Sequence, residues 1–280
     1  MVLEFICLGF CCVLISHGDL IGAHFQSQFI ISLLVRIIEN FSRFVMTFQK
    51  IDGIIKHYDR VIKGVDKKAK LSKKRAYGGV LRAEKGRLVE EITKKLIKIA
   101  WEDILNQSSK NLQFISQKFQ IPIRNEYIER LNDEELKRYI LENKKDYFYE
   151  YKPDIVVSIS DNIVMFVECK SYTENAMFKR ILVDFHLLKT LYPKADFVLV
   201  QLESQLGGDY SELKEKVFGS PQTHTLLSYF DVDIEIITLL KGERQVDKPI
   251  HKREYFKPLT RESLERAIKI IARKLRKWAS

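Results

Sequence analysis

The chain has 280 residues, of which 46% are hydrophobic and 30% are charged, and its formal net charge is +10 at pH 7. This composition is typical of a globular protein and excludes a disordered tail, a collagen-like repeat or a small disulfide-stabilised domain. The length allows one large domain, or a main domain with a small appendage. The excess of positive charge indicates a polyanionic partner, either nucleic acid or an anionic membrane.

Cysteines and histidines show no metal-binding pattern. Three cysteines lie within the first twelve residues and Cys169 stands alone in the rest, so no pair has the spacing of a structural zinc site. The six histidines are scattered, and we interpret each as a surface or core residue: His17, His24, His57, His186, His224 and His251.

Residues 1–45 differ from the rest of the chain. They hold two of the 47 basic and three of the 37 acidic residues, so residues 46–280 carry a net charge of +11. The apolar run Phe5–Ile15 is shorter than the ~20 residues that cross a bilayer. A membrane anchor, a helix packed on the body and a translated leader are all compatible with this segment. We favour a leader or mis-assigned start, because the composition changes abruptly at Met46. Residues 46–280 are then a single domain with a catalytic core at about 80–240.

The elements expected after Met46 follow in chain order. Residues 66–75 are strongly basic and predict either a solvated loop or an arm that binds a nucleic-acid backbone. Apolar residues at three- and four-residue steps predict helices at 82–105, 133–143, 174–190 and 261–278, the last with Thr260 as its N-cap. Strands are expected at 154–160, 163–170, 195–201 and 233–239. The pattern predicts an α/β fold in which a central mixed β-sheet is flanked by helices, with an extra helical N-terminal part.

The first two strands should form a hairpin that gathers charged side chains. Side chains alternate along a strand, so Glu168 and Lys170 point to one side and Cys169 to the other. A tight turn at Asp161-Asn162 would bring Asp154, at the start of the partner strand, close to Glu168.

Two carboxylates about 4 Å apart repel each other strongly unless a cation neutralises them. Oxygen ligands with positions left for water suit Mg²⁺, and a neighbouring lysine can hold the attacking water and balance phosphate charge. These are the components of metal-assisted phosphodiester hydrolysis. The alternative is an ordinary ion pair of Glu168 with Lys170 at a strand end, with Asp154 merely starting a turn.

Pro153-Asp154, thirteen intervening residues and Glu168-Cys169-Lys170 resemble the signature of the PD-(D/E)XK nucleases, which share the restriction-endonuclease-like fold. The resemblance covers residues 80–201. It implies that Asp154 and Glu168 bind the divalent metal and that Lys170 assists the nucleophilic water. It also implies that Cys169 faces the core and offers its backbone carbonyl to the metal.

Many members of this family carry a further acidic residue in a Gly-x-x-x-Glu pattern on an N-terminal helix. Gly86-Arg-Leu-Val-Glu90 is similar to that pattern, so Glu90 is the fourth expected catalytic residue. Glu91 is adjacent, and both flank the apolar stripe of the helix.

Within this family, the extensions around the motif favour a type II restriction endonuclease, because such an enzyme must surround a duplex to read its base edges. No nucleotide-binding GxxxxGK[ST] motif is present, so an ATP-driven subunit is not expected. The resemblance implies a Mg²⁺-dependent, site-specific enzyme that cuts double-stranded DNA as a homodimer. It also implies a cytoplasmic location and a cognate DNA methyltransferase as functional partner, without membrane contact. A structure-selective junction or repair nuclease, a non-catalytic DNA-binding protein and a membrane-associated protein are the alternatives.

Overall fold

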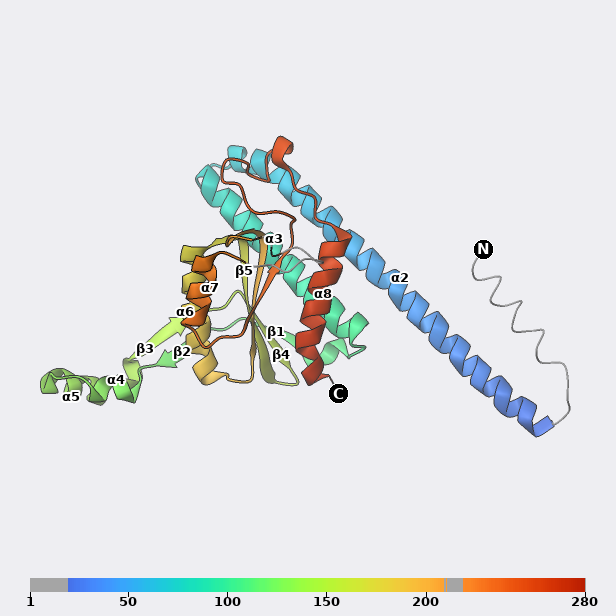
Figure 1. Cartoon of the computed structure of the whole chain (residues 1–280), viewed down its shortest axis with the longest axis horizontal. Helices are drawn as coiled ribbons and strands as arrows, with labels where there is room; N and C mark the ends of the chain where they lie inside the picture. Colours follow the sequence, from blue (N-terminus) through green and yellow to red (C-terminus); the bar gives the residue numbers. More distant parts are fainter. Residues whose placement is uncertain (1–19, 209, 211–218, 280) are drawn as a thin grey trace. The chain divides into compact units, whose positions relative to one another are not determined.

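A computed structural model describes residues 20–208, 210 and 219–279 (Figure 1). The chain divides into two units, Met1–Met46 and Thr47–Ser280, and a single long helix, α2 (Leu20–Leu71), contributes to both. The apolar run Phe5–Ile15 lies outside the described residues. Every helix within residues 20–208, 210 and 219–279 is too short or too polar to traverse a bilayer.

The second unit is built on a five-stranded sheet with the order β1-β4-β5-β6-β7. Its strands are β1 (Leu112–Ile115), β4 (Ile155–Ile159), β5 (Asn162–Glu174), β6 (Asp196–Gln205) and β7 (Ile234–Thr238). Strand β4 pairs antiparallel with β1 and with β5, whereas β5, β6 and β7 run parallel to one another. The predicted mixed sheet is therefore confirmed. β6 is buried along nearly its whole length, as expected of a central parallel strand.

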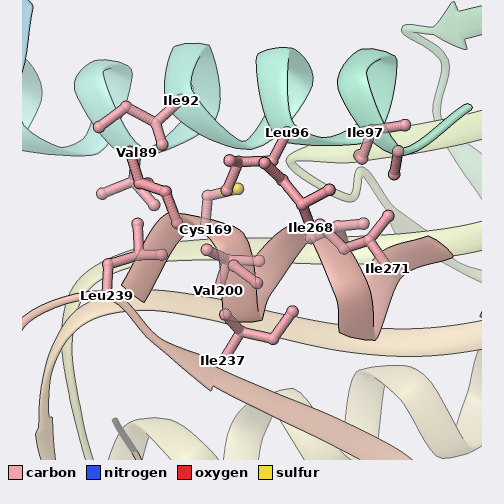
Figure 2. Packing of buried hydrophobic residues seen from close by; sticks show 14 of the residues in the cluster. Val89, Ile92, Leu96, Ile97, Cys169, Val200, Ile237, Leu239, Ile268 and Ile271 are labelled. Carbon is pink, nitrogen blue, oxygen red and sulfur yellow. The ribbon is translucent and has the colours of Figure 1, made fainter. Parts of the chain in front are cut away.

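Helices cover both faces of this sheet (Figure 1). On one face lie α3 (Tyr77–Lys98), the wider π-helical turn that continues it (Ile99–Ile104), α8 (Arg261–Leu275) and the later turns of α2. Figure 2 shows Leu96 of α3 and Ile268 of α8 meeting sheet residues such as Val200 in this core. On the other face, α6 (Asn175–Leu191) packs through Phe178 and its apolar neighbours, and α7 (Pro221–Ser228) adjoins it. The predicted helix-flanked α/β architecture is confirmed.

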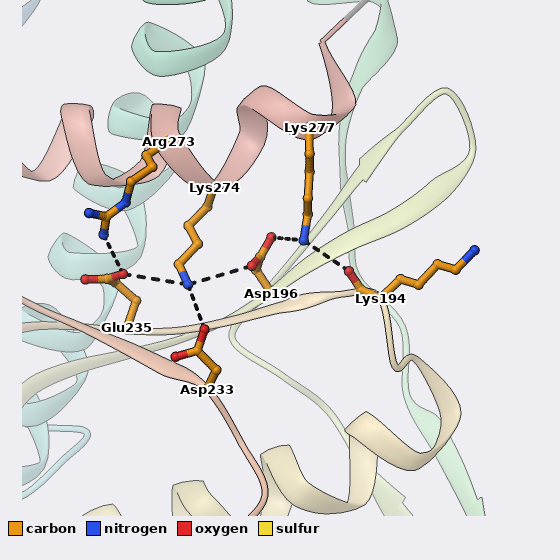
Figure 3. A network of polar contacts seen from close by, with 7 residues as sticks. All are labelled: Lys194, Asp196, Asp233, Glu235, Arg273, Lys274 and Lys277. Atoms are coloured by element: carbon orange, nitrogen blue, oxygen red, sulfur yellow. Dashed lines mark hydrogen bonds and ion pairs between the residues drawn. The ribbon is translucent and has the colours of Figure 1, made fainter.

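The closing helix α8 is fixed at both ends. Thr260 accepts a hydrogen bond from the Ser263 backbone N–H, which is the predicted N-cap. At the other end, Lys274 lies between the carboxylates of Asp196 and Asp233, at 3.8 and 3.3 Å (Figure 3). Lys277 is 2.9 Å from Asp196 and extends the network. Cations in the last turns of a helix also oppose its dipole, so these pairs fix α8 against the starts of β6 and β7.

The hairpin of β4 and β5 differs in detail from the prediction. The turn residues are Ser160 and Asp161, both with positive φ (46° and 66°), not Asp161 and Asn162. Positive φ at both central residues is the mark of a turn whose twist matches the flanking strands. The register also shifts between Val157 and Ser158, where Val164 is an extra residue in β5.

The prediction of a loop at residues 66–75 is wrong for its first part. Helix α2 continues to Leu71, and Val65 and Ala69 are buried one turn apart on its inner side. Small apolar residues four apart can hold a helix on the body even when lysines surround them, since the lysine stems extend to solvent.

Residues 116–151 form an insertion that the sequence pattern predicted only in part. Strands β2 (Phe119–Pro122) and β3 (Phe148–Tyr151) pair antiparallel, and α4 (Asn125–Glu129) and α5 (Glu134–Glu142) lie between them. Helix α5 matches the predicted helix at 133–143, and Asp133 caps it. The helical part extends away from the main sheet (Figure 1). The remaining short elements are 3₁₀ turns at Ser109–Asn111, Lys144–Asp146, Arg253–Tyr255 and Arg276–Trp278.

Candidate active site

The three charged residues of the hairpin lie together. The Lys170 ammonium nitrogen is 2.8 Å from Oδ2 of Asp154 and also forms an ion pair with Oε2 of Glu168. Asp154 directly precedes β4, whereas Glu168 and Lys170 lie on β5. The predicted convergence of the two carboxylates and the amine is therefore present in the fold.

The bulge in β5 explains why these side chains share one face of the sheet. Past the bulge, Ile155 pairs with Val167, so continuing the register by one residue places Asp154 opposite Glu168. Directly paired residues of antiparallel strands point to the same side. Phe166, two residues before Glu168, belongs to the core beneath α6, so the charged cluster lies on that side of the sheet.

Burial and the nearness of the two carboxylates shift the pKa values of this cluster. Burial raises the pKa of Glu168 above its usual value, and the nearby Asp154 raises it further, although Lys170 opposes both effects. Burial alone would lower the pKa of Lys170, but the two carboxylates outweigh it and hold that pKa above the ordinary value. Lys170 is therefore a permanent cation at neutral pH, and it compensates the negative charge of the site.

Cys169 contributes its backbone N–H to the site, whereas its side chain lies elsewhere. Its N–H donates a hydrogen bond of 2.8 Å to Oδ2 of Asp154. Its side chain points into the core between α3 and the sheet (Figure 2), with the sulfur 3.6 Å from the Thr93 hydroxyl. Burial raises the pKa of the Cys169 thiol well above its usual value, so the thiol stays neutral. The expectation that Cys169 faces the core is met, whereas the role of its carbonyl stays a prediction.

The two adjacent glutamates of α3 point in different directions. Glu91 is turned toward α2, where its carboxylate lies 2.8 Å from Nε2 of His57. Glu90 is half-buried, and its pKa is raised by burial and then by the negative charge of Asp154. The influence of Asp154 indicates that Glu90, not Glu91, faces the charged cluster. The geometry thus agrees with the choice of Glu90, and its catalytic role stays a prediction.

Two tyrosines of β3 complete the site, and the sequence pattern did not identify them. The Tyr151 hydroxyl donates a hydrogen bond to Oε1 of Glu168, and the Tyr149 hydroxyl donates one of 3.1 Å to Asp184 of α6. Their rings lie nearly parallel, with centroids 6.5 Å apart. A signal was present, because tyrosines two apart on a strand share a face and Tyr151 lies three residues before Asp154. Without the pairing of β2 with β3, however, nothing in the sequence pointed that face at Glu168.

The described part of the chain contains no cluster of three or more His, Cys, Asp or Glu side chains placed to hold a metal ion. A metal at this position would therefore rely on two carboxylates and on backbone, water or substrate oxygens. Such a donor set suits Mg²⁺, which commonly takes one or two protein carboxylates and keeps several waters.

No protein-family model matches the chain. Among solved structures, the BbvCI A2B2 tetramer gives a TM-score of 0.36 at 11% identity, covering 83% of this chain and 91% of that one. Among curated proteins, the type II restriction enzyme DdeI of Desulfomicrobium norvegicum is 50% identical over 195 residues, which is 69% of this chain and 81% of DdeI. Identity of that level over most of both chains shows common descent, and the chain belongs to the family of type II restriction enzymes, the site-specific endonucleases of restriction systems.

Proposed function

We propose that this restriction enzyme hydrolyses phosphodiester bonds of double-stranded DNA with Mg²⁺, using a PD-(D/E)XK site formed by Asp154, Glu168, Lys170 and Glu90. The observation that supports it best is the position of Lys170, whose ammonium group lies between the carboxylates of Asp154 and Glu168. The 50% identity to DdeI supports an endonuclease reaction, independently of the site geometry.

The donor atoms fit a divalent metal. Asp154 and Glu168 would hold it through carboxylate oxygens, and the backbone carbonyl of Cys169 would be a third ligand. Burial raises the pKa of Glu168 and the negative charge of Asp154 raises it further, and a divalent cation would offset both effects. A metal bound there would polarise the scissile phosphate and lower the pKa of a bound water.

The protein's own side chains orient the attacking water and the metal ligands, and they balance the charge of the phosphate. Lys170 holds the attacking water by a hydrogen bond and balances the negative charge that accumulates on the phosphate. Tyr151 holds one oxygen of Glu168 and so directs the other toward the ammonium group. Glu90 approaches from α3 and adds a third carboxylate on the side of Asp154.

Cutting both strands with one such site per chain requires two copies, so the proposal includes a homodimer on a two-fold symmetric sequence. A cognate DNA methyltransferase that protects the same sequence and a cytoplasmic location belong to the same proposal. So does the division of the chain into an apolar segment, residues 1–45, that is a leader or a mis-assigned start, and one endonuclease domain, residues 46–280, whose catalytic core is about 80–240.

Digestion of a plasmid by the purified protein tests the proposal. With Mg²⁺ the wild type should give discrete bands, and sequencing their ends should give one recognition sequence and cut position. Asp154→Ala and Lys170→Ala should each abolish cleavage while keeping sequence-specific binding. Cleavage by either variant would remove the site assignment. Binding without cleavage by the wild type would indicate a non-catalytic protein, and cutting only at branched DNA would indicate a junction nuclease.

A further inference from the structure

A basic groove lies at the C-terminal end of α2. It is a cavity of about 580 Å³ between the last turns of α2 and residues 250–256. Five lysine or arginine side chains and two carboxylates line it, leaving a net charge of +3 with histidine neutral: Lys63, Lys67, Lys70, Lys252, Arg253, Asp66 and Glu254. Ile250 and Phe256 add apolar surface.

The carboxylate of Asp66 pairs with two lysines of the groove but does not cancel the groove's net positive charge. Asp66 lies 2.7 Å from the ammonium nitrogen of Lys70 and 3.0 Å from that of Lys252, and it accepts a 2.5 Å hydrogen bond from Tyr77. These donors hold the pKa of Asp66 well below its usual value, so it remains ionised. A single negative charge shared by two lysines leaves one positive charge uncompensated.

Two further cations of the groove are available to a ligand. Lys67 and Arg253 are exposed, come from opposite walls, and form no ion pair with any residue in 20–208, 210 or 219–279. Lys63 lies 4.6 Å from the ring centroid of Phe256, so an aromatic face is present beside the cations. Cations next to an apolar face are suited to a chain of phosphates joined by sugars.

The groove is connected to the helix that carries Glu90. Lys85 of α3 lies 3.2 Å from Nδ1 of His251, whose Nε2 lies 3.2 Å from the Tyr77 hydroxyl. Lys85 precedes Glu90 by five residues, which is about 7.5 Å along a helix axis. Burial lowers the pKa of Lys85, and the negative charge of Glu203 opposes that effect. Glu203 lies two residues past Gln201, the β6 partner of Lys170. Lys85, which contacts the groove residue His251, is therefore about two base-pair steps, at 3.4 Å each, from Glu90 along the axis of α3.

We propose that this basic groove binds the sugar–phosphate backbone of duplex DNA on one side of the cleavage site, with Lys67 and Arg253 each contacting a phosphate. The inference rests on the proposed DNA cleavage and extends it, because it assigns sequence-independent binding to residues outside the charged cluster. It also gives a role to Lys67 and Lys70 of the basic stretch 66–75.

The test measures binding and cleavage separately. Binding is followed by the fluorescence anisotropy of a labelled, mixed-sequence duplex of about 30 base pairs, in EDTA, between about 50 and 200 mM salt. The variant K67Q/R253Q removes two charges, and K110Q/R276Q is the matched control. Lys110 and Arg276 are also exposed, and no ion pair joins either side chain to a described residue. Lys110 lies near the β4–β5 turn, at the other end of the hairpin from Asp154.

Since each phosphate contact contributes about 0.9 to the slope of log affinity against log salt, K67Q/R253Q should lower that slope by about 2 and weaken binding about tenfold at 100 mM salt. The control should change the slope by less than half as much. Equal slopes for the two double variants, with circular dichroism showing both folded, would overturn the inference even if the wild type cleaves DNA. A wild type that binds through the groove but never cleaves would instead overturn the proposed function alone.

Discussion

Lys170 is the residue whose replacement tests the electrostatics of the site most directly. Lys170→Met keeps the length and the apolar stem of the side chain but removes its charge. Asp154 and Glu168 would then face each other without the ammonium group that now contacts both. The side chain of Glu168 is only 7% exposed, so water can replace little of the lost interaction.

The size of the effect follows from the geometry. The two carboxylate oxygens that contact the Lys170 nitrogen lie no more than about 5.6 Å apart, because one is 2.8 Å from that nitrogen and the other is closer. Two unit charges about 5 Å apart at an effective dielectric constant of about 20 repel each other by about 3 kcal/mol, and this is the repulsion that the attraction of Lys170 to both carboxylates now offsets. That energy corresponds to a rise of about two units in the pKa of one carboxyl group.

The assay is urea unfolding in EDTA at two pH values. An acid whose folded-state pKa is raised loses stability as pH rises from its unfolded to its folded pKa. Lys170→Met should therefore lose about 3 kcal/mol of unfolding free energy near pH 8 and recover most of that loss near pH 5, where one carboxyl group is protonated. Lys118→Met is the control, because Lys118 pairs with Glu150 at an exposed position and should change stability by less than about 1 kcal/mol. A loss in Lys170→Met that is equal at both pH values would refute the reasoning.

Four further substitutions separate the roles of neighbouring residues. Glu90→Gln should reduce Mg²⁺-dependent cleavage at least tenfold. Glu91→Gln should cleave like the wild type, because Glu91 pairs with His57 instead. Equal activities of the two variants in a plasmid assay would contradict the assignment. Tyr151→Phe removes a hydrogen-bond donor that lowers the pKa of Glu168, so the acid limb of the pH–rate profile should move to higher pH, and an unchanged limb would exclude this coupling. Cys169→Ala should keep cleavage, with a cost to thermal stability of about 1 kcal/mol, because its side chain faces the core; loss of cleavage in a folded variant would mean that the side chain takes part.

The elements predicted from the sequence were those whose signal is local. The stripe of α8 and its Thr260 cap both follow from the residues of that segment alone. The same is true of α5 with Asp133 at its N-terminus, and of the apolar strand β6. Glu168 and Lys170 were placed on one face because alternation along a strand needs no knowledge of its partners.

What could not be predicted depends on contacts between distant segments. Strand β3 is exposed along most of its length. It is defined by its pairing with β2, in which Phe119 lies opposite Tyr151 and Pro122 lies opposite Phe148. Short, exposed strands carry little hydrophobic pattern, so only the partner strand defines them. The role of Tyr151 follows from that pairing, since β3 ends where its hydroxyl can reach Glu168.

The register of the hairpin shows how much the site depends on one residue. A regular hairpin around the expected turn Asp161-Asn162 would pair Asp154 with Cys169. The Asp154 carboxylate would then lie on the face of the sheet that packs against α3. A regular hairpin around the observed turn, Ser160-Asp161, would pair Asp154 with Val167, which also faces α3. Only the extra residue in β5 brings Asp154 opposite Glu168. The correct prediction that the carboxylates meet therefore depended on a regular turn at Asp161-Asn162, whereas the cause of their meeting is a bulge that alternation alone cannot reveal.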